Sequence, residues 1–556
     1  MYNYKEPTTV RSSLFSSFWA SQERHYSYLD LDPDLWFKEF RPPTIPDLVK
    51  HLERFGGQRP FGDEIFRLNV ADAQAFMSGA ERAGDGVIWG NWLTEENLYK
   101  IRVPLTTSAG IRWKKVGRPK KGDALEGAAL EASMDLRGLR EGVMYDTPPA
   151  FVAGRGKLVD SRGGPSKKEG RLIVVPDLKR HLLGSLAAVP YSSAVKSFSK
   201  AEGGVMIGMG PFKGDYMSLA SQVLGKKPMY FLMVDFSGYD QTVPAPVILA
   251  SLQRISRRFE VVPGSDAYWE SEYVHLTETK IVLPNGQVYV KSRGVSSGDP
   301  WTSQVGSEAN WLMNVITFKV RGWVAYAWVF GDDVVIAVVE GPSDPSVALE
   351  QYTKTIYELF GLEVKVSDSY ATEQLIVSGP EPVEGQSAKF LSSYFMNRDE
   401  GVVPVPTFNS VLERMLYPET NRFDEIVELS GQEVADQILF EKGRVVSMYL
   451  LSFHNEFAFT MLHDYWNWLD ARDPGGGTVR ARDWLALFTQ WDVPVENFYF
   501  DMSGLPTDAF IMEMHRPAYY PPKVSWLLRT RSVRAPDTGV VGEVRLQSSD
   551  RREDMS

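Results

Sequence analysis

Two apolar runs separated by three small or acidic residues form the clearest pattern in the chain. Residues 323–330 and 334–339 are rich in β-branched and aromatic side chains, and Gly331, Asp332 and Asp333 stand between them. Runs of this length and composition are typical of buried strands, and glycine followed by aspartate suits a tight turn. The pattern predicts a β-hairpin whose tip carries two adjacent carboxylates.

Further strands are predicted on both sides of this hairpin. The apolar run 229–234 ends at Asp235, so a second strand can deliver a carboxylate to the same place. Residues 171–175, an arginine followed by four branched apolar residues, also have strand character. Residues 281–290 contain a central Asn-Gly dipeptide, which predicts a second hairpin.

Helices are predicted where apolar residues recur at helical spacing. The segments concerned are residues 45–55, 246–259, 302–320, 345–360, 445–470 and 481–490. Because strands and helices are mixed along the chain, we expect an α+β fold with an antiparallel sheet flanked by helices, the helices lying on one face of the sheet.

Composition narrows the class of protein. The chain has 556 residues, of which 43% are hydrophobic, enough for a large core divided among several lobes. It has no cysteine, which excludes disulfides, thiolate metal sites and cysteine nucleophiles. No apolar run approaches the roughly 20 residues of a membrane span. We therefore expect a soluble, intracellular protein with no membrane segment.

The net charge of -11 argues against a nucleic-acid partner only if charge is spread evenly. It is not, because one stretch is strongly basic; its cations are Arg155, Lys157, Arg162, Lys167, Lys168, Arg171, Lys179 and Arg180. A second basic stretch covers residues 112–121. Either stretch could line a channel for RNA, but a solvated loop or, for the second, a localisation signal would show the same composition.

The three carboxylates at strand ends suggest a chemistry. Asp235, Asp332 and Asp333 together would form a hard-oxygen site suited to Mg²⁺. Two such ions roughly 3.5 to 4 Å apart can activate an attacking hydroxyl and stabilise a leaving oxygen. Phosphoryl transfer needs little beyond this, although a Gly-Asp-Asp tripeptide alone is also a common turn.

A third cluster of small and polar residues lies in the sequence between Asp235 and the Gly331-Asp332-Asp333 turn. It reads Arg293-Gly294-Val-Ser-Ser297-Gly298 and runs on to Thr302 and Asn310. The three clusters, in this order, resemble motifs A, B and C of palm-domain viral RNA-dependent RNA polymerases. The spacing in motif B is most similar to the polymerases of double-stranded RNA viruses of the partitivirus and picobirnavirus kind.

The resemblance implies roles for the acidic residues. Asp235 and Asp332 would bind two Mg²⁺ ions, for which Mn²⁺ could substitute, and Asp333 would add charge and act as a further ligand. Asp240 and Asn310 would form a hydrogen-bonded pair that tests for the sugar 2′-hydroxyl, the group that separates RNA from DNA.

It also implies roles for residues around the nucleotide. The basic stretch resembles motif F, so Arg171 and then Lys168 would neutralise the triphosphate. Ser297 and Thr302 would lie beside the incoming nucleotide and the template, and Gly298 would let the motif B loop flex.

Three later features carry weaker signals. Lys365 stands near the place where motif D puts a proton donor to pyrophosphate, at a slightly different offset. Residues 389–395 resemble motif E near the primer end, or are simply core. Residues 515–526 put aromatic side chains in a proline-rich loop, which could stack on the first nucleotide during initiation or pack on the surface.

The resemblance implies a right-hand polymerase with fingers, palm and thumb, acting on an RNA template and nucleoside triphosphates. We expect the lobes to divide as follows: 1–228 mostly fingers, 229–259 palm, 260–292 fingers insertion, 293–400 palm, 401–537 thumb and 538–556 a flexible tail. Capsid protein is a further candidate partner, and the virion interior or host cytoplasm the expected location. The alternatives are a reverse transcriptase-like enzyme and a catalytically silent palm with a structural or genome-packaging role.

Overall fold

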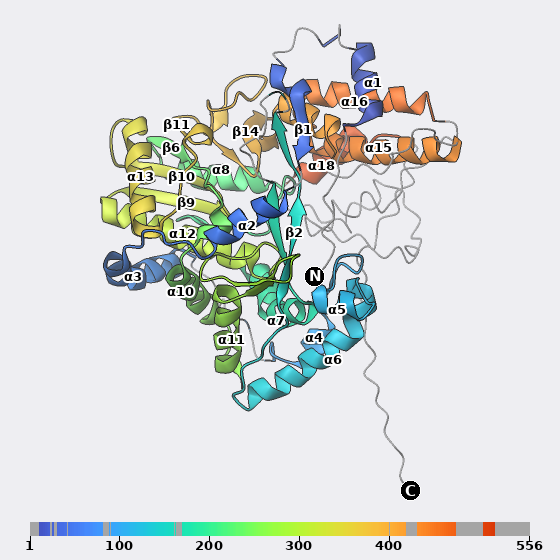
Figure 1. The fold of residues 1–556 in the computed structure, drawn as a ribbon. Helices are drawn as coiled ribbons and strands as arrows, with labels where there is room; N and C mark the ends of the chain where they lie inside the picture. The colour runs from blue at the N-terminus through green and yellow to red at the C-terminus, as the bar shows by residue number, and fades with distance from the viewer. Residues whose placement is uncertain are drawn as a thin grey trace.

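The computed structural model (Figure 1) describes most of the chain. The described residues are 11–22, 25–26, 31–41, 43–81, 88, 91–160, 162, 170–399, 401–418, 431–473 and 504–516. Lys168, the predicted helix 481–490, the tail 538–556 and nearly all of the loop 515–526 lie outside them. Within these ranges, no helix combines the length and the apolar character needed to cross a bilayer.

A five-stranded sheet, called the central sheet below, lies in the left part of Figure 1. Its order is β11 (Tyr370–Thr372), β6 (Tyr230–Met233), β10 (Asp333–Glu340), β9 (Val324–Phe330) and β5 (Gly204–Val205). β9 and β10 form the predicted hairpin, and β6 pairs antiparallel with β10. β5 runs parallel to β9, so the sheet is mixed rather than purely antiparallel.

Both faces of this sheet are covered, which differs from the expectation of helices on one face. Val334, Ile336 and Val338 point to the core shared with the helices α3 and α12, whereas Val335 and Ala337 point to a second core with α8. Successive side chains of a strand alternate between faces, so residues 334–338 of β10 are all apolar because neither face of the sheet meets solvent there. The helices packed on the first face are α3 (Asp63–Glu81), α10 (Ala245–Ser256), α12 (Thr302–Arg321) and α13 (Pro345–Phe360), and α8 is Asp215–Gly225.

A second sheet carries the predicted motif F strand. Its order is β4 (Arg171–Val175), β2 (Ala150–Arg155), β7 (Lys280–Val282) and β8 (Val288–Val290). β7 and β8 form the predicted Asn-Gly hairpin. The helix α2 (Ile45–Arg54) packs its apolar side chains on this sheet. The neighbouring helices are α4 (Glu95–Tyr99), α5 (Ile111–Lys115), α6 (Lys121–Arg140), α7 (Leu178–Val195) and α11 (Ser265–Thr277).

The C-terminal part is a small sheet followed by helices. The sheet contains β12 (Ile376–Val377), β13 (Lys389–Phe390), β14 (Ser393–Arg398) and β15 (Gly401–Val405). The helices are α14 (Phe408–Leu416), α15 (Gly431–Leu451), α16 (Glu456–Asp470) and α18 (Asp508–His515).

The prediction of one helix over 445–470 is wrong. The segment forms two helices, α15 and α16, because the Asn455 side chain accepts a hydrogen bond from the Ala458 N–H and so caps the start of α16.

The N-terminal segment packs on the C-terminal helices. α1 (Ser13–Gln22) and the short helix η1 (Pro33–Phe37) share a core with α14, α15 and α16. The chain then crosses back, since β1 (Lys38–Arg41) pairs antiparallel with β3 (Lys157–Asp160) beside β2. The predicted lobe 1–228 is therefore not one packing unit, and the division into lobes stays a prediction.

Candidate active site

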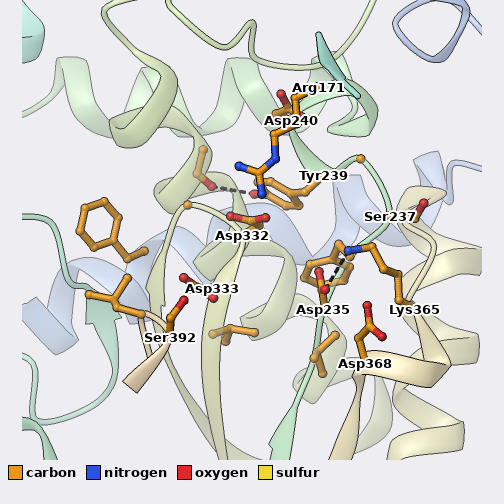
Figure 2. Close-up of a pocket in the computed structure, with 18 of the residues that line it drawn as sticks. Arg171, Asp235, Ser237, Tyr239, Asp240, Asp332, Asp333, Lys365, Asp368 and Ser392 are labelled. Carbon is orange, nitrogen blue, oxygen red and sulfur yellow. Dashed lines mark hydrogen bonds and ion pairs between the residues drawn. The ribbon is translucent and has the colours of Figure 1, made fainter. Parts of the chain in front are cut away.

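A cleft with a volume of about 1700 Å³ opens where the central sheet, β4 and α14 meet. Figure 2 shows part of its wall. Nine of the predicted site residues line it: Arg171, Asp235, Asp240, Ser297, Gly298, Thr302, Asp332, Asp333 and Lys365. The structure thus brings together side chains that are scattered over almost 200 positions of the sequence.

The acidic wall consists of the carboxylates that follow β6 and begin β10. Asp235, Asp332 and Asp333 face one space (Figure 2). The side chains at the hairpin tip reach solvent, but protein surrounds them on most sides, and this desolvation raises the pKa of Asp332. Desolvation and the charges of Asp332 and Asp235 raise the pKa of Asp333 to about 6. The wall therefore holds more negative charge than its own cations compensate.

A divalent cation fits this wall by the chemistry of its donors, which are all carboxylate oxygens. Within the described ranges, no three Asp, Glu, His or Cys side chains already converge closely enough to enclose an ion. One reason is visible at Asp235, whose Oδ2 lies 2.7 Å from the Lys365 Nζ. An ion at Asp235 would replace that lysine.

Lys365 reaches Asp235 because the two backbones are joined. The Lys365 N–H donates to the Asp235 carbonyl (2.8 Å), and Phe236 forms an antiparallel bridge with Val364. The Asp235 N–H donates to the Ser369 hydroxyl (3.0 Å). Lys365 therefore contacts the acidic wall directly, and its role as a proton donor stays a prediction.

The Gly-Asp-Asp turn is held from behind by α12. Gly331 has a φ of +62°, which favours glycine. Its N–H donates to the Ser307 hydroxyl (2.8 Å), and its carbonyl accepts from the Asn310 side chain (2.9 Å). Both polar groups of the turn's first residue are thus satisfied by one helix. Sequence reasoning missed Ser307, although it stands three positions before Asn310 and so on the same helix face.

The predicted pair of Asp240 and Asn310 is wrong. Asn310 is fully buried on α12 and bonds Gly331 and Asn314, so it does not face the cleft. Asp240, on the short helix α9 (Tyr239–Thr242), accepts instead from the Ser297 hydroxyl at 2.6 Å. Burial raises the pKa of Asp240.

The motif B loop is attached to both walls of the cleft. The Val295 N–H donates to the Asp240 carbonyl (2.7 Å), and the Val174 N–H of β4 donates to the Ser297 carbonyl (3.1 Å). Gly298 has a φ of +98°, and a Cβ there would lie 2.6 Å from the Val174 carbonyl oxygen. Glycine is therefore required for close packing on β4, and flexing of this loop stays a prediction.

Thr302 begins α12, and its hydroxyl donates to the carbonyls of Ser296 and Asp299. It lies on the cleft wall as predicted, but its hydroxyl is used within the motif B loop. Its contact with nucleotide or template stays a prediction.

The basic wall comes from separate segments. Arg171 begins β4 opposite Arg155 of β2, and its guanidinium extends toward Asp240 and Asp332 (Figure 2). Two cleft residues from α2, His51 and Arg54, were not identified from the sequence, because nothing local in a helix reports which distant strand it packs on.

The segment that resembles motif E pairs as expected. β13 and β14 are antiparallel, and the turn between them places Leu391 and Ser392 on the cleft. Both residues have positive φ, of 50° and 62°. Ser392 lies beside Asp333 in Figure 2. A contact with the primer end stays a prediction.

Comparison with known proteins identifies the family. The sequence profile for viral RNA-dependent RNA polymerase matches residues 102–464. The chain belongs to this family. The predicted class of enzyme, an RNA-directed RNA polymerase that binds RNA and nucleotides, is thereby confirmed, and the family generally uses divalent metal ions.

The relatives found among curated proteins come from astroviruses. The non-structural polyprotein 1AB of Human astrovirus-5 is 23% identical over 282 residues, which are 48% of this chain and 18% of that protein. The corresponding polyprotein of Human astrovirus-1 is 23% identical over 246 residues, which are 42% of this chain and 16% of that protein. The chain therefore spans under a fifth of the length of these relatives.

A solved structure shares the fold. The Sicinivirus 3Dpol RNA dependent RNA polymerase superposes with a TM-score of 0.59 at 13% identity, covering 88% of this chain and 97% of that one. The predicted right-hand α+β polymerase fold is confirmed. The more specific resemblance to partitivirus and picobirnavirus polymerases is not supported by these matches, which point to astroviruses and a picornavirus-like polymerase.

Proposed function

We propose that this polymerase extends RNA by two-metal-ion nucleotidyl transfer, with Mg²⁺ as the ion and Mn²⁺ able to replace it. The observation that carries the proposal is the meeting of three strand-end carboxylates with Arg171 in one cleft. Asp235 and Asp332 would hold the ions, and Asp333 would contribute charge or a further oxygen. When bound, the ions would supply charge neutralisation at the attacking and leaving oxygens.

In the reaction, the 3′-oxygen of the RNA forms a bond to the α-phosphorus, and the bond from that phosphorus to the pyrophosphate oxygen breaks. Arg171 contributes by neutralising the triphosphate, because its planar guanidinium can donate two parallel hydrogen bonds to phosphate oxygens. The cleft fixes the reacting groups, which is most of what phosphoryl transfer requires.

Lys365 would act at two stages. In this structure its ammonium group forms an ion pair with Asp235. With Asp235 holding an ion instead, the ammonium group would remain beside the cleft, where it could donate a proton to the departing pyrophosphate. Its contact with Asp235 thus supports the predicted role despite the unusual offset in the sequence.

Asp240 and Ser297 would discriminate between ribose and deoxyribose in the incoming nucleotide. Both belong to segments that meet in the cleft, and their bond engages Oδ2 of Asp240, so that among the described residues Oδ1 has no hydrogen-bond donor. A ribose 2′-hydroxyl can donate to such a carboxylate, whereas a deoxyribose cannot. We therefore assign the sugar test to Asp240 with Ser297 in place of Asn310.

The test is a template-directed incorporation assay with labelled nucleotides on a primed RNA template. RNA product from ribonucleotides with Mg²⁺, and none with the ions chelated, is the expected result. Efficient product from deoxynucleotides would favour the reverse transcriptase-like alternative, and no product under any condition would favour the silent palm. Asp240 and the complete set of acids support the polymerase proposal over both.

The virus type, the capsid partner and the location are predicted from the sequence alone. The double-stranded RNA virus assignment depends on motif B spacing alone, and the capsid partner and location inside the virion or host cytoplasm depend on that assignment. They stay predictions. Mass spectrometry of purified virus particles would show whether this chain is packaged with capsid protein.

A further inference from the structure

His51 lies on the buried face of α2, outside residues 102–464 that match the family, and its ring lines the cleft. Only 6% of the residue is exposed. α2 begins at a capping box formed by Thr44 and Asp47 and packs on the second sheet. The helix therefore delivers the ring to the cleft in a fixed position.

The two ring nitrogens contact two different segments. Nε2 lies 2.6 Å from the Gly170 carbonyl oxygen, and Nδ1 lies 3.3 Å from Oε1 of Gln241. Because a carbonyl oxygen only accepts, Nε2 carries a proton. Nδ1 can bond the Gln241 amide in either charge state of the ring, since the amide can present its oxygen or its nitrogen. Gly170 directly precedes Arg171, and Gln241 directly follows Asp240.

Both anchors of the ring are tightly packed. A Cβ at Gly170 would lie 2.5 Å from the Cδ of Pro43 and 3.0 Å from the Arg155 carbonyl oxygen. Gln241 is buried, and its N–H donates to the Gly238 carbonyl at 3.0 Å. His51 thus joins two rigid points, each one residue away from a side chain of the nucleotide site.

We propose that His51 is a positioning residue that fixes the separation between Arg171 and Asp240. The inference rests on the proposed function, in which these residues face the triphosphate and the sugar of one nucleotide. A ligand that contacts both binds well only when their separation matches its own dimensions. Loss of the bridge should therefore weaken nucleotide binding and sugar selection more than the chemical step.

Two substitutions separate bridging from packing. His51→Leu keeps a buried apolar side chain but no hydrogen bond, whereas His51→Gln keeps an amide that can donate to Gly170. In steady-state assays on a primed RNA template, His51→Leu should raise KM for nucleotides about three- to tenfold, as for one or two lost hydrogen bonds, with kcat almost unchanged. His51→Gln should recover most of that loss. His463→Leu, on the exposed face of α16, is the control for the same substitution at a histidine that does not line the cleft.

Two further readouts complete the test. The preference for ribonucleotides over 2′-deoxynucleotides should fall in His51→Leu and stay at the wild-type level in the control. Hydrogen exchange should become faster at residues 170–172 and 240–243 in His51→Leu, and not in β9 or β10. This second readout needs no enzymatic activity.

The outcomes are distinct. Wild-type KM and sugar preference in His51→Leu would overturn the inference, and so would a loss of kcat and melting temperature with KM unchanged, which indicates a structural role only. If the wild-type protein makes no RNA, the proposed function fails, and the exchange comparison alone decides whether His51 links the two segments.

Discussion

The two walls of the cleft are built differently. The acidic wall consists of short side chains at strand ends, and α12 fixes its turn through both polar groups of Gly331. The basic wall consists of long side chains from α2, β2 and β4, with Arg171 solvent-exposed at the start of its strand. Ion coordination depends on distances of tenths of an ångström at the carboxylate oxygens, whereas a long arginine side chain on a fixed backbone can adjust its guanidinium to a phosphate. The rigidity of each wall thus matches the geometric demand of its proposed task.

The largest expected effect is on the acidic wall. Asp332→Asn or Asp235→Asn keeps the shape of the side chain but removes the charge that would hold an ion. RNA synthesis should fall by about a thousandfold or more, because the reaction loses its main electrostatic stabilisation. The measurement is incorporation of labelled nucleotide on a primed template.

The control for this pair is Asp63→Asn, an exposed carboxylate on α3. Circular dichroism and RNA binding should match the wild type in all three variants, since removing these acids opens no cavity. Residual synthesis above a tenth of the wild-type rate in Asp332→Asn would show that the acidic wall is not the ion site.

A smaller and different effect is expected from the basic wall. Arg171→Gln should raise KM for nucleotides about ten- to a hundredfold, the range for charged hydrogen bonds of about 1.5–3 kcal/mol. Arg171→Lys should recover part of this loss, because a point charge remains. Nucleotide titrations at low and moderate salt measure both. Arg137→Gln, an exposed arginine of α6, should leave KM unchanged; a wild-type KM in Arg171→Gln would remove this residue from the triphosphate site.

The contrast between the walls also explains what sequence could predict. The hairpin of the acidic wall was predictable because its strands, turn and carboxylates lie within seventeen consecutive residues. The Asn310 assignment failed because the motif showed that the residue was special without showing which way the helix face points. The position of His51 in the cleft could not be predicted, since its hydrogen-bond partners stand 119 and 190 residues away in the sequence.

In the C-terminal region, too, contacts between segments distant in the sequence could not be predicted. The packing of α1 on α14 and α16 joins segments about 400 residues apart, and apolar helices of this kind do not specify their partners. The break before α16 was closer to being predictable, because Asn455 is a good N-cap and stands three residues before Ala458. Continuous apolar spacing across the break concealed it.

The support behind the acidic turn can be tested at Ser307. Ser307→Ala leaves the Gly331 N–H without its partner, at a cost of about 1–3 kcal/mol for a buried donor. We expect a several-fold lower kcat with KM for nucleotides nearly unchanged, because the displaced group is on the acidic wall. Ser251→Ala on α10 is the matched control, since this serine is also buried and bonds only the carbonyl four residues before it. Equal kcat in the two variants would mean that the turn holds its shape without Ser307.

The smallest expected effect is on the free energy of unfolding, which repulsion among the carboxylates of the acidic wall lowers when no ion is bound. The pKa of Asp333 is raised from its ordinary 3.8 to about 6. Between these pH values the folded state still binds a proton that the unfolded state has lost. The contribution of Asp333 to the stability of the folded state therefore falls as the pH rises through this window. Asp333→Asn should therefore stabilise the metal-free protein at pH 7 by about 1 kcal/mol, after allowing for solvent screening at the cleft surface. The gain should disappear below about pH 4, where the carboxyl is protonated in both states. Thermal unfolding in chelator measures it, and Asp72→Asn, whose carboxyl pKa is lowered by Lys319, should show no such gain. A metal-free Asp333→Asn protein no more stable than the wild type would mean that the acidic wall is not strained by its own charge.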